Sequence, residues 1–220
     1  MHKPVSLPSG PGEGIGDVRR AQRMHDELST GFANLAGVRR AVTVFGSART
    51  RPGTKEYDLA FDIGARLAEA GYPVITGGGP GVMEGSNKGA KLAGGTSIGV
   101  GIVLPMEQRL NDHLTNGWTC RYFFTRKVFF VKNSQAFIVL PGGFGSLDEL
   151  FEVLTLVQTR KLDKRPIILA GVEFWGGLVA WINEKLLAEG KVSPGDPDLL
   201  HVVDTAEEAV EIVKAHVPAS

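Results

Sequence analysis

The sequence predicts an α/β fold in which a single domain is built on a Rossmann-like, doubly wound parallel sheet. Short runs that are apolar along their whole length alternate with longer segments whose apolar residues recur at helical spacing. Strands of that kind are typical of a parallel sheet covered by helices on both faces. The chain has 220 residues, of which 43% are hydrophobic, and it contains neither an internal repeat nor a linker that would divide it.

The N-terminal part of the chain precedes the expected sheet. Residues 1–16 are rich in Pro, Gly and Ser, and we expect them to form a flexible tail. An N-terminal helix is expected within residues 17–40, because several apolar side chains there are spaced for one helical face. These side chains are Val18, Ala21, Met24 and Leu28. The Rossmann-like domain would then span residues 41–220.

Strands and helices alternate through this domain. The apolar runs predict strands at residues 41–46, 72–76, 96–104, 136–140, 166–170 and 200–203. Helices are expected at residues 57–70, from the turn 77–85 to residue 92, within 121–132 after a short strand, from Ser146 onward, at 174–188 and at 205–215. Residues 105–119 have no clear period, and we expect a surface loop there. Asp204 or Thr205 is expected to cap the last helix.

The stretch from residue 135 to residue 154 organises the rest of the chain. An apolar strand ends at Pro141, and a tight turn leads into a helix that opens with Ser146. The turn holds three glycines: Gly142, Gly143 and Gly145. The first backbone N–H groups of a helix lack intrahelical partners, and the helix dipole is positive there. Glycines let an anion approach those groups closely, so a phosphate is the expected guest.

A carboxylate, Glu149, lies one turn from the same helix start. It would repel a phosphate if it pointed at it, so we expect it to face another part of the ligand. In a doubly wound sheet, ligands bind beyond the carboxyl ends of the strands, at the point where the strand order reverses. We therefore expect three turns to face one crevice: Gly46–Arg49, Gly77–Gly81 and Gly142–Gly145.

Composition excludes several classes of function. Lys and Arg number 24, as do Asp and Glu, so the formal net charge is zero and nothing supports general affinity for nucleic acid or membranes. The single cysteine, Cys120, cannot form an internal disulfide, and we interpret it as a small buried hydrophobe. The N-terminus has no apolar signal core and no stretch is long enough to span a bilayer, so we expect a cytoplasmic protein.

Several catalytic motifs are absent from the sequence. The spacing G-x-G-x-x-G occurs in none of the glycine clusters, and the P-loop pattern is missing as well, which argues against a hydride-transfer enzyme or a P-loop nucleotidase. There is no H-E-x-x-H or paired-cysteine pattern for a metal, and no G-x-S-x-G elbow for a serine nucleophile.

Four short motifs together resemble a known family. PGGFGSLDE, residues 141–149, is similar to the PGGxGTxxE signature of the LOG family, the cytokinin riboside 5′-monophosphate phosphoribohydrolases once labelled lysine decarboxylases. VFGSAR resembles the first strand and turn of that family, GGGPGVME its second glycine loop, and TRK its Arg-Lys pair. The resemblance covers roughly residues 41–181. Ser146 replaces the Thr of the signature and keeps the hydroxyl.

The resemblance implies a hydrolase that cleaves the N-glycosidic bond of a nucleoside 5′-monophosphate, AMP or an N6-modified AMP such as a cytokinin riboside monophosphate. Residues 41–220 would then be a nucleotide-binding catalytic domain, with Arg126 and Glu149 as its catalytic pair. The implied substrate-binding residues are Ser47, Arg49, Gly78, Gly79, Glu84, Lys127, Gly142, Gly143, Gly145 and Ser146. Neither a metal nor a cofactor is implied. The resemblance further implies a homodimer, or a larger assembly of dimers, with residues 121–132 as a candidate contact.

Other interpretations of these residues stay open. Ser146-x-x-Glu149 also matches a capping box, in which both side chains satisfy the helix start. Arg126 and Lys127 also match a solvated helix face, and Glu84 an ordinary surface residue. At the level of function, a carrier of the molybdenum cofactor with a similar fold would need the phosphate cradle without the catalytic pair. A lysine decarboxylase remains as an inherited label, without an evident pyridoxal phosphate site.

Overall fold

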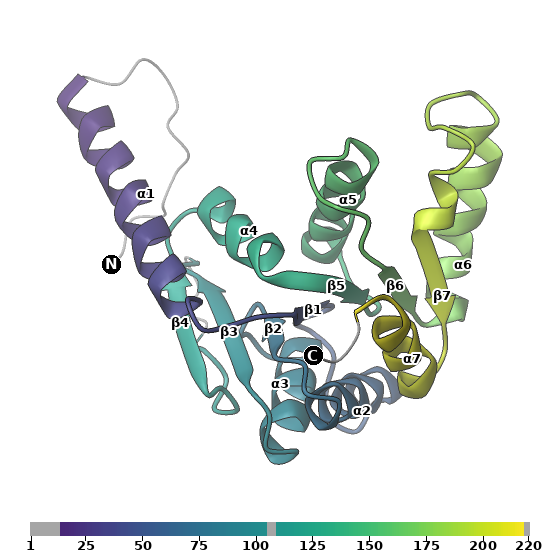
Figure 1. The fold of residues 1–220 in the computed structure, drawn as a ribbon, viewed down its shortest axis with the longest axis horizontal. Helices are drawn as coiled ribbons and strands as arrows, with labels where there is room; N and C mark the ends of the chain where they lie inside the picture. Colours follow the sequence, from purple (N-terminus) through teal and green to yellow (C-terminus); the bar gives the residue numbers. More distant parts are fainter. Residues whose placement is uncertain (1–13, 105–108, 218–220) are drawn as a thin grey trace.

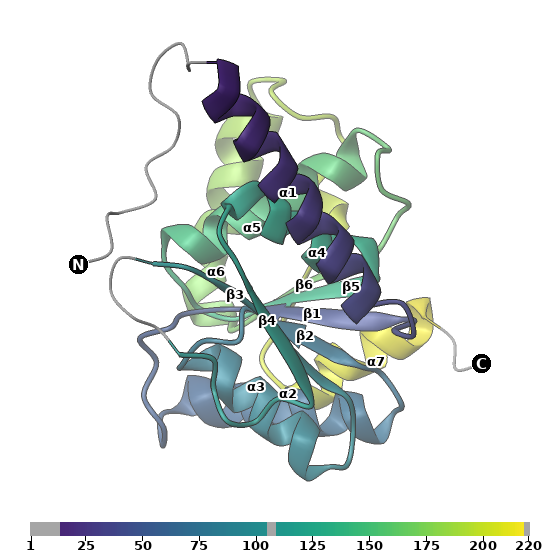
Figure 2. The same ribbon diagram turned by 90° about the vertical axis from the view of Figure 1, so that its left-hand side faces the viewer.

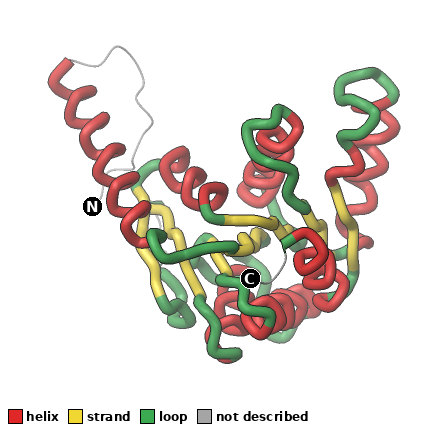
Figure 3. The backbone as a smooth tube through the Cα atoms, in the orientation of Figure 1, coloured by secondary structure: helices red, strands yellow, loops and turns green. Residues whose placement is uncertain are grey.

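The computed structural model describes residues 14–104 and 109–217. A flexible tail is expected at residues 1–16, and residues 1–13 of it lie outside the described part. Within it the chain folds around one sheet of seven strands in the order β4-β3-β2-β1-β5-β6-β7 (Figures 1 and 3). All neighbouring strands pair in parallel. The strand order reverses between β1 and β5, so the doubly wound fold and its switch point are confirmed.

The strands and helices have the following bounds. The strands are β1 Ala41–Phe45, β2 Val74–Thr76, β3 Ser97–Ile102, β4 Asn116–Cys120, β5 Ser134–Val139, β6 Ile167–Ala170 and β7 Leu200–Val203. The helices are α1 Gly14–Asn34, α2 Lys55–Glu69, α3 Val82–Leu92, α4 Phe123–Lys132, α5 Phe144–Gln158, α6 Val172–Trp181 and α7 Ala206–His216. Two short helical turns follow, a π-helix at Ile182–Leu187 and a 3₁₀ turn at Pro197–Leu199.

Two hydrophobic layers cover the sheet, one on each face. Helices α2, α3 and α7 lie on one side and α4, α5 and α6 on the other, as the two perpendicular views show (Figures 1 and 2). Alternate residues of one strand contribute to different layers: Val42 and Val44 pack toward α2, and Phe45 toward the other helices. Every residue of β1 and β6 is buried, which explains why both strands read as continuous apolar runs.

The segment expected to be a loop at residues 105–119 contains a strand instead. β4, Asn116–Cys120, pairs with β3 at the edge of the sheet, and exposed residues alternate with less exposed ones along it. Asn and Gly are poor strand formers, and an edge strand needs only one partner, so its sequence has no continuous apolar run. The short strand expected after residue 121 is therefore this strand, displaced toward the N-terminus, and α4 follows it. Residues 105–108 lie outside the described part.

Four helix starts also differ from the predictions. α2 begins at Lys55, two residues before the expected start at Tyr57. α1 begins at Gly14 rather than Asp17, and α6 begins at Val172 before passing into the π-helix. α5 begins at Phe144, with Gly143 as its N-cap, two residues before the expected start at Ser146. The last helix begins as expected, because Thr205 caps α7 in a capping box with Glu208.

Glycines allow α2 and α3 to pack at very short range. A Cβ atom added to Gly89 of α3 would lie 2.0 Å from the carbonyl oxygen of Phe61, and one added to Gly64 of α2 would lie 2.1 Å from the carbonyl oxygen of Ser86. Both obstacles are backbone atoms, which cannot move aside as a flexible side chain can. This contact fixes the position of α3, whose N-terminus follows the second glycine turn.

Substitution of Gly89 by Ala should therefore destabilise the fold by about 1–3 kcal/mol, because the helices must separate. Gly176 is the matched control: it is an exposed glycine within α6 whose added Cβ would meet nothing within 4 Å. Gly176→Ala should stabilise the protein by roughly 0.5–1 kcal/mol, as expected for Ala in an open helix position. Urea unfolding of the two variants measures both effects, and equal shifts in the same direction would contradict this account of α2–α3 packing.

Candidate active site

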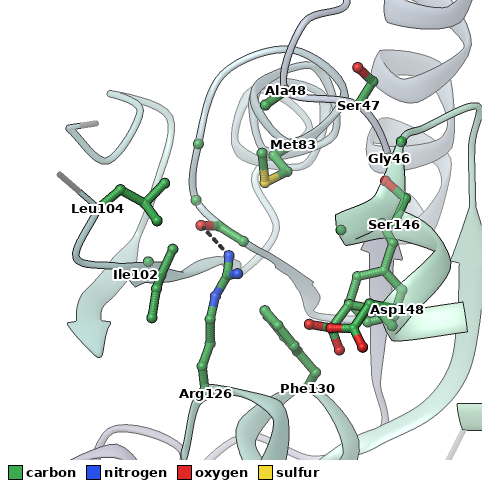
Figure 4. Close-up of a pocket in the computed structure, with 18 of the residues that line it drawn as sticks. Gly46, Ser47, Ala48, Met83, Ile102, Leu104, Arg126, Phe130, Ser146 and Asp148 are labelled. Carbon is green, nitrogen blue, oxygen red and sulfur yellow. Dashed lines mark hydrogen bonds between the residues drawn. The ribbon is translucent and has the colours of Figure 1, made fainter. Parts of the chain in front are cut away.

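A cavity of about 650 Å³ lies at the switch point, beyond the carboxyl ends of β1, β2 and β5. The three turns that follow these strands all contribute to its lining, as the sequence predicts. Figure 4 places Gly46, Ser47 and Ala48 of the first turn and Ser146 of the third along the same space, with Met83 of α3 beside them.

The backbone of Ser47 ties the three turns together. Its N–H donates a hydrogen bond to the carbonyl of Pro141 in the third turn, at 3.1 Å, and its own carbonyl accepts one from the N–H of Val82, at 3.0 Å. The Ser47 hydroxyl accepts a hydrogen bond from the N–H of Arg49 and so shapes the first turn. A Cβ atom on Gly81 would lie 2.3 Å from the Ser47 carbonyl oxygen, so this close approach requires glycine.

A buried polar network holds the second turn. Thr76 accepts a hydrogen bond from the N–H of Gly78 and donates one to Asn87 at 2.6 Å. Asn111 donates from its backbone to the carbonyl of Gly78 and from its side chain to Gly79 and Asn87. The carbonyls of Gly78 and Gly79 are thus satisfied by Asn111, and the turn keeps one shape without a ligand.

The third turn presents the start of α5 to the cavity. The N–H groups of Ser146 and Leu147 both donate to the carbonyl of Gly143, so they are already satisfied. Among the described residues, no acceptor bonds the N–H groups of Phe144 and Gly145, which are therefore available to an anion. Gly142 does not line the cavity, but a Cβ there would lie 2.1 Å from the Ser146 hydroxyl, so glycine makes room for that group.

The capping-box interpretation of Ser146 and Glu149 is wrong. Gly143 is the N-cap residue and makes no side-chain capping hydrogen bond, so Ser146 stands at the third helical position. Glu149 then lies in the second turn of α5, too far along the helix to bond the cap. Both side chains are 93% buried by residue and both line the cavity, so their positions must be explained by something other than capping.

Arg126 is fixed to the opposite side of the cavity. Its Nε donates to the carbonyl of Val100 at 2.7 Å, and its Nη2 donates to the carbonyl of Gly77 at 3.2 Å. The guanidinium lies over the ring of Phe130, with 4.9 Å between Cζ and the ring centroid (Figure 4). Burial lowers the pKa of Arg126, although Glu149 nearby opposes this, and an arginine remains protonated. The solvated-face interpretation therefore fails for Arg126.

Glu149 is a carboxylate with a strongly perturbed pKa. Burial raises its pKa to about 7 from an ordinary value of 4.5, and the positive charges of Lys127 and Arg126 only partly oppose this. Its Oε2 atom lies 3.4 Å from the Nζ of Lys127, whose ammonium also lies 2.9 Å from Asp148 and contacts Glu152. A buried carboxyl group that titrates near neutral pH beside a cavity is a common feature of active sites.

The predicted site residues divide into two groups. Those that line the cavity are Ser47, Arg49, Gly78, Gly79, Arg126, Gly143, Gly145, Ser146 and Glu149. Gly142, Glu84 and Lys127 are absent from the lining. The Glu84 carboxylate accepts a hydrogen bond from the Tyr57 hydroxyl on α2, at 3.3 Å, and Lys127 contacts α5 instead.

Other lining residues were not predicted from the sequence. Arg109 and Leu110 come from a segment without a period, Ile102 is the last residue of β3, and Leu104 follows it by two residues. Phe144 lines the rim and is 92% exposed. The exposed Phe123 and the buried Phe130 both line the cavity, whereas Phe129, from the same aromatic run, lies in the core. The sequence signal for Phe144 is its place inside the glycine signature PGGFGSLDE, whereas its exposure is known only from the structure.

Comparison with known proteins identifies the family. A family model described as "Possible lysine decarboxylase" matches residues 83–213, more than half of the chain. The cytokinin riboside 5′-monophosphate phosphoribohydrolase of Mycobacterium tuberculosis is 37% identical over 158 residues, which are 70% of this chain and 82% of that relative. The chain belongs to the LOG family. Another LOG family relative is the probable enzyme LOGL5 of Oryza sativa, 34% identical over 81% of this chain and 73% of its own length.

Solved structures of molybdenum cofactor proteins share the fold. A molybdenum cofactor carrier protein from Chlamydomonas reinhardtii superimposes with a TM-score of 0.59 at 25% identity, over 81% of this chain and 98% of its own. A molybdenum cofactor binding protein from Rippkaea orientalis gives a TM-score of 0.62 at 22% identity, over 80% and 96%. The second likeness concerns the fold alone.

Three further findings concern membrane helices, metal sites and the single cysteine. None of the helices that the described residues form is both long and apolar enough to cross a membrane. No three His, Cys, Asp or Glu side chains within residues 14–104 and 109–217 gather as a metal site would require. Cys120 is buried, and burial raises the pKa of its thiol to about 11, which opposes a role as a nucleophile.

The raised pKa of Glu149 makes a prediction about stability. Because the folded protein binds this proton more tightly than the unfolded chain, the contribution of Glu149 to stability is greatest below pH 4.5 and is lost as the pH rises through 7. Glu149→Gln cannot ionise, so its stability relative to the wild type should increase across this window, by up to about 3 kcal/mol. Thermal unfolding between pH 4 and pH 8 measures the difference.

The matched control for this measurement is Glu207→Gln. Glu207 is an exposed carboxylate in the first turn of α7, far from the cavity lining. Its substitution should change stability without a comparable dependence on pH. A pH-independent difference for Glu149→Gln as well would contradict the burial of an ionisable carboxylate at this position.

Proposed function

We propose that the protein hydrolyses the N-glycosidic bond of a nucleoside 5′-monophosphate, AMP or an N6-modified AMP such as a cytokinin riboside monophosphate, and releases the free base and ribose 5-phosphate. The observation that carries this proposal is the juxtaposition, in one cavity, of an open helix N-terminus with the buried Glu149 and the partly buried Arg126. The names of the similar phosphoribohydrolases support the same reaction.

The phosphate would bind at the start of α5. The N–H groups of Phe144 and Gly145 and the hydroxyl of Ser146 supply donors there, and the helix dipole adds positive potential. Arg49 also lines the cavity and adds a positive charge. Glu149 follows Ser146 by three residues on α5, almost one helical turn, so the ribose of a bound monophosphate would lie against its carboxylate.

The chemistry of glycosidic cleavage suits the two buried groups. As the bond breaks, positive charge develops on the ribose, and the Glu149 carboxylate would stabilise it and take a proton from the attacking water. A carboxyl pKa of about 7 matches a general base that works near neutral pH. Arg126 stays protonated, and N–H groups that are not bonded to Gly77 or Val100 would stabilise the leaving base.

The base would bind at the apolar side of the cavity. Ile102 and Leu104 lie across the cavity from Ser146 and Asp148 (Figure 4). Leu110 and Met83 add further apolar side chains to the lining. Apolar side chains around a few polar groups are the usual lining of a site for a planar ring. We place the purine ring there, with the phosphate at α5.

A second candidate function is a cofactor carrier, because the Chlamydomonas carrier protein shares the fold at 25% identity. A carrier would use the phosphate-binding turn and would need no ionisable carboxylate beside it. The burial of Glu149 with Arg126 favours the hydrolase, since burying charged groups lowers stability and is retained where it serves a function. Decarboxylation by a Schiff-base lysine is disfavoured, because no lysine is among the described residues that line the cavity.

The proposed activity is tested by incubating the purified protein with a panel of nucleoside 5′-monophosphates and the matching nucleosides. We expect free base from AMP or an N6-modified AMP, and much slower release from the nucleosides, because the phosphate supplies the anchor. Glu149→Gln should lower kcat by roughly 10²–10⁴-fold, the usual contribution of a general base. Chromatography of the released base measures both.

Two outcomes would count against this function. Equal rates with nucleosides and monophosphates would refute the phosphate anchor at α5. Base release by Glu149→Gln at the wild-type rate would refute the catalytic assignment, and the control Glu207→Gln should retain full activity. Tight binding of the molybdenum cofactor without release of any base would favour the carrier.

We further propose a homodimer, or an assembly of dimers, in the cytoplasm, where nucleoside monophosphates are made. Large apolar side chains are exposed on the sheet face covered by α4, α5 and α6. On these helices they are Phe123, Phe124, Val128, Phe144, Phe151, Val172, Phe174 and Trp181. Apolar patches of this kind on one face favour association with another protein surface, and we take a second copy of this chain as that partner.

Val128→Glu should weaken the proposed dimer, because it places a charge among the exposed apolar side chains of this face. Val128 is 39% exposed on α4, so a monomer would tolerate this change. Leu92→Glu is the matched control, since Leu92 is 68% exposed on α3, on the opposite face of the sheet. Light scattering after size exclusion should show a lower mass for Val128→Glu alone, and a wild-type monomer would refute the proposal.

A further inference from the structure

Lys127 lies at the centre of a cluster of carboxylates on α5. Its Nζ atom lies 2.9 Å from Asp148 Oδ2 and 3.4 Å from Glu149 Oε2, and it also contacts Glu152 Oε2. The Lys127 side chain is only 17% exposed. Although burial opposes it, hydrogen bonds to Glu152 and Asp148 raise the pKa of Lys127, so the ammonium stays charged. The Lys127 ammonium of α4, which is little exposed, thus contacts three carboxylates of α5.

Only two residues of this cluster line the cavity. Asp148 and Glu149 line the cavity, whereas Lys127 and Glu152 do not. Lys127 therefore approaches Glu149 from behind, with no position from which to contact a ligand in the cavity. A role in binding substrate, as the family resemblance implied for Lys127, does not fit this placement.

The contacts to Glu149 are one-sided. Lys127 approaches Oε2, and among the described residues nothing donates a hydrogen bond to Oε1. The shorter contacts of Lys127 are those to Asp148 and Glu152, so these two carboxylates hold the ammonium and limit how closely it can pair with Glu149. An oriented carboxylate with one free oxygen is the arrangement that a base beside a cavity needs.

We propose that Lys127 is a positioning residue: anchored by Asp148 and Glu152, it holds Oε2 of Glu149 and leaves Oε1 to act on the ligand. This inference rests on the proposed hydrolysis for its kinetic consequence, but the geometry of the cluster does not depend on that reaction. Lys127 would act through Glu149 alone and would contribute to kcat rather than to substrate binding.

The charges around Glu149 determine how each substitution should act. Arg126 and Lys127 face it from α4, and Asp148 and Glu152 come from α5 itself. Removing a positive charge disfavours the ionised carboxylate, and removing a negative charge favours it. Lys127→Met and Glu152→Gln should therefore shift the titration of Glu149 in opposite directions, which a purely structural role for this contact would not produce.

The experiment compares Lys127→Met, Lys127→Arg, Glu152→Gln and a control, Lys132→Met. Lys132 is an exposed cation at the end of the same helix, over the ring of Phe32 and away from the cavity lining. Lys127→Met should lower kcat at pH 7 by roughly 10–100-fold, the loss expected for a misplaced catalytic group, with KM changed less than about threefold. Lys127→Arg should recover part of kcat, and Lys132→Met should match the wild type.

The second readout is a ¹³C NMR titration of the Glu149 carboxyl carbon, assigned by its absence in Glu149→Gln. Lys127→Met should raise the midpoint by about one pH unit or more, and Glu152→Gln should lower it. Midpoints unchanged in both variants, or wild-type kcat in Lys127→Met, would overturn the inference. If the wild type releases no base from any monophosphate, the proposed function fails, and the titration alone still decides whether Lys127 controls Glu149.

Discussion

The structure depends on the contact of three backbone turns at the switch point of the sheet. Ser47 bonds the third turn through its N–H and the start of α3 through its carbonyl, and the turns approach this closely because Gly46, Gly81 and Gly142 carry no side chain. This contact can form only when β1 lies between β2 and β5, so the order of the strands in the sheet determines where the cavity lies. The position of every cavity-lining group on these turns follows from it.

A second constraint comes from α4, which carries the two cations that act on Glu149. Arg126 reaches the carbonyl of Gly77 in the second turn, and Lys127 reaches the carboxylates of α5 beyond the third. Two adjacent residues of one helix therefore bind opposite sides of the cavity. Although Glu149 lies near these positive charges, burial still makes its carboxyl group hard to ionise. Ionised Glu149 therefore lowers the stability of the protein at the residue that is proposed to act in catalysis.

The sequence was sufficient for the fold and for the backbone of the site. Buried, mostly apolar strands, such as β1 and β5, and the glycine turns after them were predictable because local pattern and tertiary role agree. The edge strand β4 was not, since pairing with β3 overrides its weak propensity. Ser146 and Glu149 match a capping box by spacing, and only the true helix start at Phe144 excludes it. The direction of Lys127, toward α5 and away from the cavity, depends on packing that no local pattern records.

The hold on Arg126 has a thermodynamic consequence. Long side chains lose about 1.5–2 kcal/mol of rotamer freedom when they are ordered. The carbonyls of Val100 and Gly77 and the ring of Phe130 fix this guanidinium through contacts within the protein itself. This rotamer entropy is therefore lost when the chain folds. A ligand that binds Arg126 does not have to order the side chain again, so binding does not incur that entropy loss.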